Sequence, residues 1–306
     1  MAAHILTGTV DFDAKAGKPC QTAYTIFGDL KSGTTPVVAL HGGPGSTHHY
    51  ILSIADLATK YSVPVVFYDQ LGNGESTHLP EKSGEAGSFW TEQLFLDELD
   101  NLLRHLGIQD NYSLIGHSWG GMLAARHAAR QPKGLQRLVI SNSPACMRLF
   151  VKAANEELIV KLDSPVRDTL MKHEQAGTTD SAEYQDAMLE FYKRHLCRLW
   201  PWPRELTQSF EYMEKDHTVY FTMNGPSEFY ITGLLKDWSI VDEANKIEVP
   251  TLLLNGAYDE AADSTVIPFF RAIPRVKWYT FAESSHNPHW EEREKYMKLV
   301  SDFLKA

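Results

Sequence analysis

The stretch YSLIGHSWGGMLAARHAAR, residues 112–130, decides the fold. Its apolar beginning is typical of a strand and its alanine-rich end is typical of a helix. Between them lies Gly116-His117-Ser118-Trp119-Gly120, a G-x-S-x-G pattern. A serine on such a sharp turn needs glycine on both flanks, because side chains there would collide with the strand and the helix. The N-terminus of the following helix also favours developing negative charge. The stretch therefore predicts Ser118 as a nucleophile at a strand–helix turn.

Apolar runs and helical patterns alternate on both sides of this turn. The strand-like runs are residues 36–40, 63–68, 112–115, 135–141, 251–254 and 276–281. Alternation of this kind predicts an α/β fold with a mostly parallel sheet covered on both faces. The first 40 residues predict an antiparallel edge.

The alternation breaks after Ser143 and resumes near residue 243. The stretch between is long, aromatic and charged, with mostly helical patterning. We therefore predict an α/β core formed by residues 1–143 and 243–306, with a mostly helical cap formed by residues 144–242.

Composition narrows the function classes. The chain has 306 residues, 43% of them hydrophobic, and a formal net charge of −10, which argues against nucleic-acid and anionic-membrane surfaces. Three scattered cysteines, Cys20, Cys146 and Cys197, form neither a disulfide framework nor a zinc motif. The N-terminal residues resemble no signal peptide, and no apolar run reaches the ~20 residues of a membrane span. We expect a cytoplasmic protein without metal or organic cofactor, and its oligomeric state stays open.

A serine nucleophile needs a base and an orienting acid, which follow it in the chain order Ser, Asp or Glu, His. The strand-like run TLLL is followed by Asp259, our predicted acid, with Asp263 as the weaker choice. The last strand-like run is followed by His286, our predicted base. His289 is close by, but we expect it to have entered the next helix.

An oxyanion hole needs two backbone N–H groups. Trp119, directly after the nucleophile, is expected to supply one. The other is expected from the loop His41-Gly42-Gly43-Pro44-Gly45. Pro44 has no N–H, so Gly42 or Gly43 must donate, and Gly43 is preferred.

Four motifs together resemble the proline iminopeptidase family of α/β-hydrolases. They are HGGPG (41–45), DQLGNGES (69–76), GHSWGG (116–121) and GAYDE (256–260), in the family's order and spacing. The stretch NGPSEFYITGLLKDW (224–238) looks like the branch containing the archaeal tricorn-interacting aminopeptidase and the fungal amino-acid amidases. Leu71 departs from the arginine of many relatives. The resemblance implies a helical cap over the active site. It also implies release of an N-terminal residue, proline or another apolar one, from a peptide or amino-acid amide.

The resemblance also implies a binding site for the free α-amino group of the substrate. Acidic residues form this site in the family, and the matching positions are Glu228 and Glu260. The alternative for Glu228 is an ion pair with Lys236 or Arg198. Aromatic residues crowd the predicted cap, and we include Tyr230 among the predicted substrate-binding residues.

Two other classes of function remain open at this point. An esterase, a lactonase or a small-amide amidase would use the same triad and differ only in the cap. A non-catalytic binding protein on this scaffold would also keep these motifs. Labelling by a serine-reactive fluorophosphonate without turnover would identify the latter.

Overall fold

A computed structural model of the chain describes residues 4–85 and 87–306. Within these residues the sheet has eight strands in the order β1-β2-β4-β3-β5-β6-β7-β8. The strands are β1 Ile5–Phe12, β2 Cys20–Phe27, β3 Val37–Leu40, β4 Val65–Tyr68, β5 Tyr112–His117, β6 Leu135–Ser141, β7 Thr251–Gly256 and β8 Val276–Phe281. β1 and β2 form an antiparallel edge and β2 pairs antiparallel with β4, whereas all other pairs are parallel. The predicted α/β class and antiparallel edge are confirmed.

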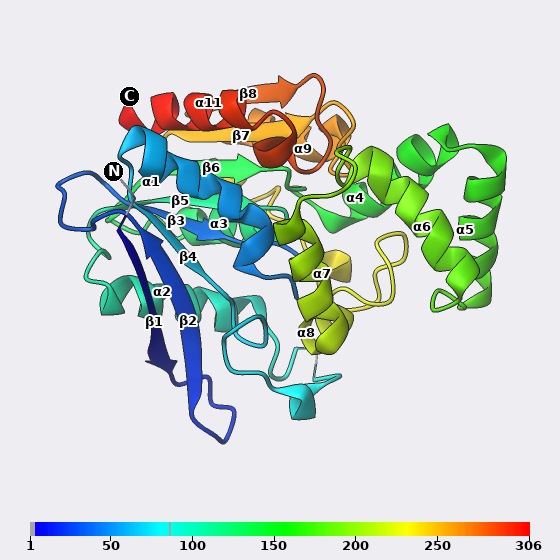
Figure 1. Cartoon of the computed structure of the whole chain (residues 1–306), viewed down its shortest axis with the longest axis horizontal. Coiled ribbons are helices and arrows are strands. Elements are labelled where there is room, and N and C mark those ends of the chain that lie inside the picture. The colour runs from blue at the N-terminus through cyan, green and yellow to red at the C-terminus, as the bar shows by residue number, and fades with distance from the viewer. Residues whose placement is uncertain (1–3, 86) are drawn as a thin grey trace.

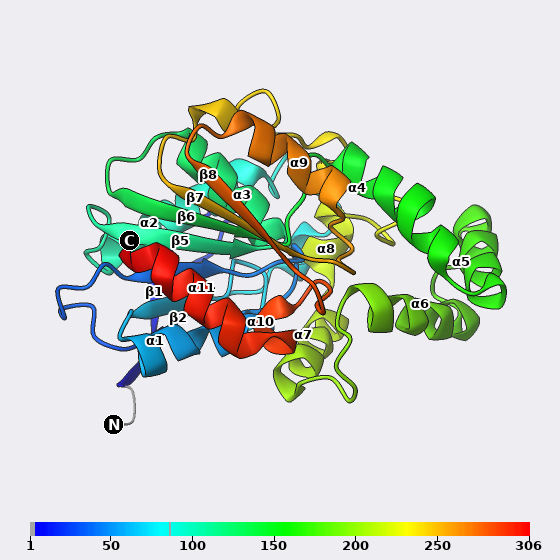
Figure 2. The same cartoon turned by 90° about the horizontal axis from the view of Figure 1, so that it is seen from above.

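Helices cover both faces of the sheet (Figures 1 and 2). They are α1 Asp56–Tyr61, α2 Glu92–His105, α3 Trp119–Ala129, α4 Met147–Ala153, α5 Ser164–Ala176, α6 Ala182–His195, α7 Arg204–Lys215, α8 Thr218–Met223, α9 Asp263–Ala272, α10 Pro288–Glu291 and α11 Arg293–Lys305. Alternate strand residues face opposite layers, as the period of a strand requires. In β3, Val38 and Leu40 join the core cluster that contains residues of α2 and α3, whereas Val37 and Ala39 join the cluster with α1 and α11. This double coverage explains why the strands are continuously apolar.

The segment between β6 and β7, residues 142–250, carries α4 to α8 and is called the inserted segment below. Part of it shares the main core, since Val219, Met223 and Trp238 belong to that cluster. Cys197 and Leu206 join the cluster on the other face of the sheet. A smaller cluster, from Ala154 to Phe229, lies within the inserted segment itself. Figure 2 shows α5 and α6 projecting beyond the sheet.

The helical pattern ends earlier than the sequence predicted. Regular α-helix stops at Met223, and residues 224–250 are turns and short 3-10 pieces. Asn224-Gly225-Pro226 explains the stop, because Gly225 has a φ of 120° and proline cannot continue a helix. None of the helices in residues 4–85 and 87–306 combines the length and the apolarity that a bilayer crossing requires.

Candidate active site

Ser118 lies on the turn between β5 and α3, as predicted. Its φ of 56° and ψ of −126° place a non-glycine residue in strained backbone, held by the hydrogen bond from its N–H to Ser141 O at 3.0 Å. Only glycine fits at positions 116 and 120, because a Cβ at either position would collide with backbone atoms. A Cβ on Gly116 would lie 2.1 Å from Gly120 O, and one on Gly120 would lie 2.2 Å from Leu40 O. The turn therefore presents the serine at the carboxyl edge of the parallel strands.

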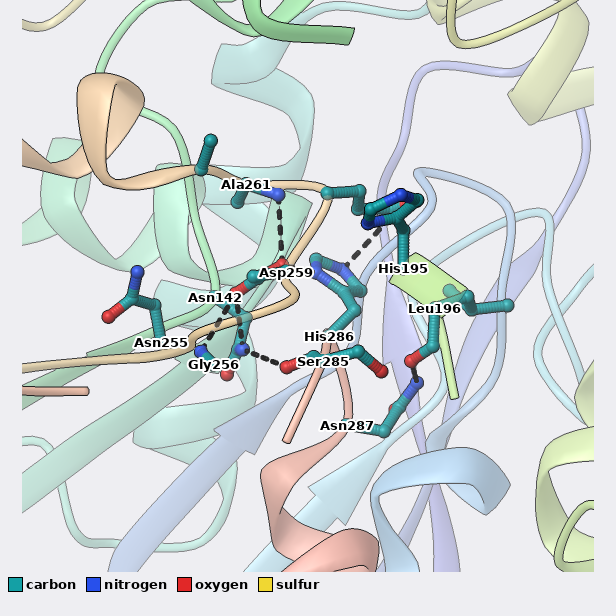
Figure 3. Close-up of polar contacts among 12 residues, drawn as sticks. Asn142, His195, Leu196, Asn255, Gly256, Asp259, Ala261, Ser285, His286 and Asn287 are labelled. Atoms are coloured by element: carbon teal, nitrogen blue, oxygen red, sulfur yellow. Dashed lines mark hydrogen bonds and ion pairs between the residues drawn. The ribbon is translucent and has the colours of Figure 1, made fainter. Parts of the chain in front are cut away.

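Asp259 and His286 lie on the loops after β7 and β8 and contact each other, with Asp259 Oδ1 2.6 Å from His286 Nδ1. Asp259 also accepts hydrogen bonds from Asn142 Nδ2 at 2.6 Å and from the Ala261 N–H at 2.8 Å (Figure 3). Burial raises the pKa of Asp259 well above its usual value, and the hydrogen bonds from Ala261 and Asn142 act in the opposite direction. These donors favour the ionised carboxylate as acceptor, with the proton of His286 on Nδ1. Burial lowers the pKa of the His286 imidazole to about 3. The ring is therefore neutral, and its Nε2, which lies 3.3 Å from Glu260 Oε1, carries no proton.

The alternative acid and base lie elsewhere. Asp263 is in the first turn of α9 and accepts a hydrogen bond from Asn255 Nδ2 at 2.7 Å. His289 is in α10, fully buried, with Nδ1 2.9 Å from Ser53 Oγ. Neither lines the cavity that Ser118 and His286 share.

The loop after β3 distinguishes between Gly42 and Gly43. The Gly42 N–H donates to Tyr50 Oη at 2.7 Å and is therefore engaged. Gly43, at a φ of 107°, lines the cavity together with Ser118. Within the described part of the chain, the N–H groups of Gly43 and Trp119 have no hydrogen-bond acceptor. These two donors match the predicted oxyanion pair.

A directed chain of hydrogen bonds links the oxyanion loop to the base. His117 Nε2 lies 2.6 Å from His286 O, and only a donor can bond to a carbonyl, so the His117 proton is on Nε2. Its Nδ1 then accepts from Tyr50 Oη at 2.8 Å, and Tyr50 in turn accepts from Gly42. Burial lowers the pKa of His117 well below its usual value, which keeps this ring neutral. No sequence pattern marks Tyr50, which lies in the 3-10 helix His48–Ala55.

Glu228 and Glu260 face the same cavity as Ser118 and His286. Each has a buried Oε2 atom without a hydrogen-bond partner, and Glu260 Oε1 lies 3.3 Å from His286 Nε2. Among residues 4–85 and 87–306, no Lys or Arg forms an ion pair with either carboxylate. Arg198, the alternative partner, lies over the ring of Tyr258 and donates to Glu283 O.

The two carboxyls also shift each other's ionisation. Burial raises the pKa of Glu228, and burial together with the charge of Glu228 raises the pKa of Glu260 well above its usual value. Two carboxyls in such a place do not both ionise readily without a cation.

Tyr230, which the sequence analysis included among the substrate-binding residues, does not line this cavity. Its side chain is 59% exposed and lines a separate surface depression with Arg148 and Lys236. Residues 224–233 are irregular, so nearby positions in the chain face different directions. The tyrosines that line the cavity are Tyr50, Tyr192 and Tyr220.

The inserted segment is hydrogen-bonded directly to the loops that carry Glu260 and His286. The carbonyl oxygen of His195, at the end of α6, accepts the N–H groups of His286 at 3.1 Å and Glu260 at 3.2 Å. Asn287 Nδ2 donates to Leu196 O at 2.7 Å (Figure 3). The position of the base and the position of the helices above it are therefore coupled.

Comparison with known proteins identifies the family. Residues 35–293 match the family model described as the alpha/beta hydrolase fold. The proline iminopeptidase of Saccharolobus solfataricus is 35% identical over 275 residues, which are 90% of this chain and 86% of that protein. The crystal structure of the Mycobacterium smegmatis proline iminopeptidase has 41% identity and a TM-score of 0.89, over 98% of each chain. That of VinJ has 50% identity and a TM-score of 0.93, also over 98% of each chain. With this fold, these motifs and this identity over most of its length, the chain belongs to the proline iminopeptidase family of α/β-hydrolases.

Proposed function

We propose that this protein is a serine aminopeptidase. It releases an N-terminal proline or another apolar residue from peptides or amino-acid amides. The observation that carries the proposal is the pair Glu228 and Glu260, two buried carboxylates without a cationic partner in the cavity of Ser118. Relatives named proline iminopeptidase support the same reaction class.

The chemistry follows from the triad. Ser118 Oγ attacks the carbonyl carbon of the N-terminal residue while His286 Nε2 takes its proton. Asp259 holds the imidazole and stabilises its positive charge. The N–H groups of Gly43 and Trp119 stabilise the oxyanion. His286 then protonates the departing amine, and water hydrolyses the aminoacyl ester on Ser118 by the same steps in reverse.

The free α-amino group supplies the missing cation. An ammonium between Glu228 and Glu260 compensates two carboxylates that burial otherwise keeps from ionising together. An N-acylated substrate offers no charge and leaves the carboxylates unpaired. The site therefore selects unblocked N-termini.

A paired assay tests this proposal. It compares kcat/KM for prolyl, alanyl and phenylalanyl anilides with their N-acetylated counterparts in the wild type and in Glu228→Gln. We expect activity on free amines only, and a loss in Glu228→Gln of about 2–5 kcal/mol, or about 30- to 4,000-fold. Glu211→Gln, on the exposed side of α7, is the matched control and should keep wild-type rates. Equal cleavage of acetylated substrates, or an unaffected Glu228→Gln variant, would overturn the proposal.

A further inference from the structure

The cavity above Ser118 has two lobes that share Gly43, Ser118, Tyr220, Glu228 and Glu260. The small lobe has a volume of about 40 Å³, and its other lining includes Trp119, Met122, Pro144, Met147, Phe150 and Leu235. The large lobe has a volume of about 90 Å³, and its other lining includes Leu196, Leu206, Phe210, Met213 and His286. Both lobes thus meet at the nucleophile and at the two carboxylates.

We propose that the small lobe holds the side chain of the N-terminal residue and that the large lobe holds an uncharged, apolar leaving group. Free dipeptides are therefore poor substrates compared with the corresponding amides. This inference rests on the proposed aminopeptidase function and names the substrate class of that site.

The position of the base assigns the lobes. His286 must protonate the leaving nitrogen, so the leaving group occupies a space that His286 lines. His286 lines the large lobe and is absent from the lining of the small one. The α-amino group stays at Glu228 and Glu260, where the lobes meet. The side chain of the N-terminal residue therefore occupies the small lobe.

The walls of the small lobe select a small apolar side chain. Trp119, Met122 and Leu235 are at most 2% exposed and belong to the main core cluster, so this wall is firmly packed. This lobe is the smaller of the two, at about 40 Å³ against about 90 Å³. We therefore expect a proline ring or the side chain of alanine or valine to be accepted in preference to a benzyl group.

The charges of the large lobe exclude a carboxylate. Of the described residues that line it, none is Lys or Arg, and its acidic members are Glu228 and Glu260. On the same measure the large lobe, at about 90 Å³, is about twice the size of the small one. The C-terminal carboxylate of a dipeptide would lie in or at this lobe, desolvated and beside two carboxylates that the ammonium has already engaged. An amide, an alkylamine or an arylamine carries no such charge.

The first experiment compares prolyl-leucine with prolyl-leucinamide, which differ only in the carboxylate. We expect kcat/KM to favour the amide by at least about 30-fold, mainly through KM. In Met213→Arg, which adds a cation to the large lobe, this preference should fall at least about tenfold. Met213→Gln, without the charge, should keep the preference. Equal rates on the two substrates, or equal ratios in the two variants, would overturn the proposal.

A crossed pair of variants tests the assignment of the lobes. Phe150→Ala enlarges the small lobe and should raise phenylalanyl over prolyl anilide by at least about tenfold without altering the amide-to-dipeptide ratio. Phe210→Ala enlarges the large lobe and should shift preference among leaving groups only. The reverse pattern would overturn the assignment. Cleavage of N-acetyl-prolyl-leucinamide at the rate of prolyl-leucinamide would refute the proposed function itself, whatever the carboxylate comparison gives.

Discussion

Asp259 at the sheet edge and Glu228 in the inserted segment both have buried carboxylate oxygens, and they differ in their partners. Asp259 accepts hydrogen bonds from Asn142, Ala261 and His286. Glu228 Oε2 has no donor. Asp259 is fixed in position by its donors, whereas Glu228, like Glu260 on the loop after β7, keeps a buried oxygen without a partner. The satisfied carboxyl positions the imidazole, and the two unsatisfied carboxyls create a demand for a ligand.

We expect the largest effect on activity from replacement of Ser118 at the edge of the sheet. Ser118→Ala should lower kcat by about 10⁴–10⁶-fold, since the covalent step disappears. The substitution removes one oxygen and leaves the glycines of the turn in place, so the unfolding midpoint should change little. Anilide turnover and urea unfolding measure the two quantities. Retained turnover would contradict the mechanism.

Substitution of one glycine in each region compares how rigid the two regions are. Gly120→Ala forces a Cβ to within 2.2 Å of Leu40 O, which is backbone and cannot rotate away. We expect a loss of about 3–5 kcal/mol in the free energy of unfolding. Gly177, after α5 in the inserted segment, has a φ of 65°, and a methyl group there would meet nothing within 4 Å. Gly177→Ala should cost only about 1 kcal/mol. Comparable losses for the two variants in urea denaturation would contradict the comparison.

Glu98 of α2 is a further buried carboxyl. Like Asp259 it accepts hydrogen bonds, so it tests how burial affects a carboxyl that has donors. It accepts hydrogen bonds from Thr22 Oγ1 at 2.5 Å and from the Leu71 N–H at 2.9 Å, and burial raises its pKa to about 8. A raised pKa in the folded state makes the protein lose stability as pH rises from about 4.5 to about 8, and no further above. Relative to Glu98→Gln, the wild type should lose up to about 1.4 kcal/mol per pH unit over this range. Urea denaturation at pH 5, 6, 7, 8 and 9 measures the difference, and a constant difference would contradict this account.

The smallest effect concerns the hydrogen-bond chain from Gly42 to His286. Tyr50→Phe leaves the Gly42 N–H and His117 Nδ1 without their shared partner, at a cost of about 1–3 kcal/mol. We expect kcat to fall about tenfold while KM changes by less than about twofold, because the chain positions groups that act in the transition state. Tyr112→Phe removes a comparable tyrosine–histidine bond, at 2.6 Å from His127 Nε2, and should leave kcat unchanged. A purely structural role for Tyr50 would give the two variants the same kinetics.

The sequence predicts those site residues whose position depends on a local pattern, such as a strand directly before them. Ser118, Asp259 and His286 each follow a strand, and because the carboxyl ends of parallel strands meet at one edge, their order in the chain predicts that they lie at that edge. The sequence does not predict which side chains far apart in the chain form hydrogen bonds with each other. Tyr50 and His117 are 67 positions apart, and Asn142 and Asp259 are 117 apart. Such pairings follow from packing and leave no local signal.

The irregular part of the inserted segment explains why Glu228 and Tyr230 face different directions. In a helix or a strand, periodicity tells which residues share a face, but residues 224–233 have no period. Glu228 therefore faces the cavity while Tyr230 faces solvent, and only the folded backbone distinguishes them. The choice between Gly42 and Gly43 likewise depended on a partner, Tyr50, that the local sequence does not reveal.

The inserted segment leaves the sheet after β6 and returns at β7, and these two strands are paired neighbours. Because these strands are parallel, the segment leaves at the carboxyl end of β6 and returns at the amino end of β7, so it must cross back over the sheet between its two ends. Each doubling of the length of a flexible loop between fixed points costs only about 0.6 kcal/mol. Changes of length are therefore tolerated best in parts of the segment outside the main core, such as the connection between α5 and α6, whereas Val219, Met223 and Trp238 belong to that core. Much of the substrate preference is thus encoded in the inserted segment, whereas the nucleophile is encoded in the sheet. New substrates can therefore be acquired without a change to the nucleophile.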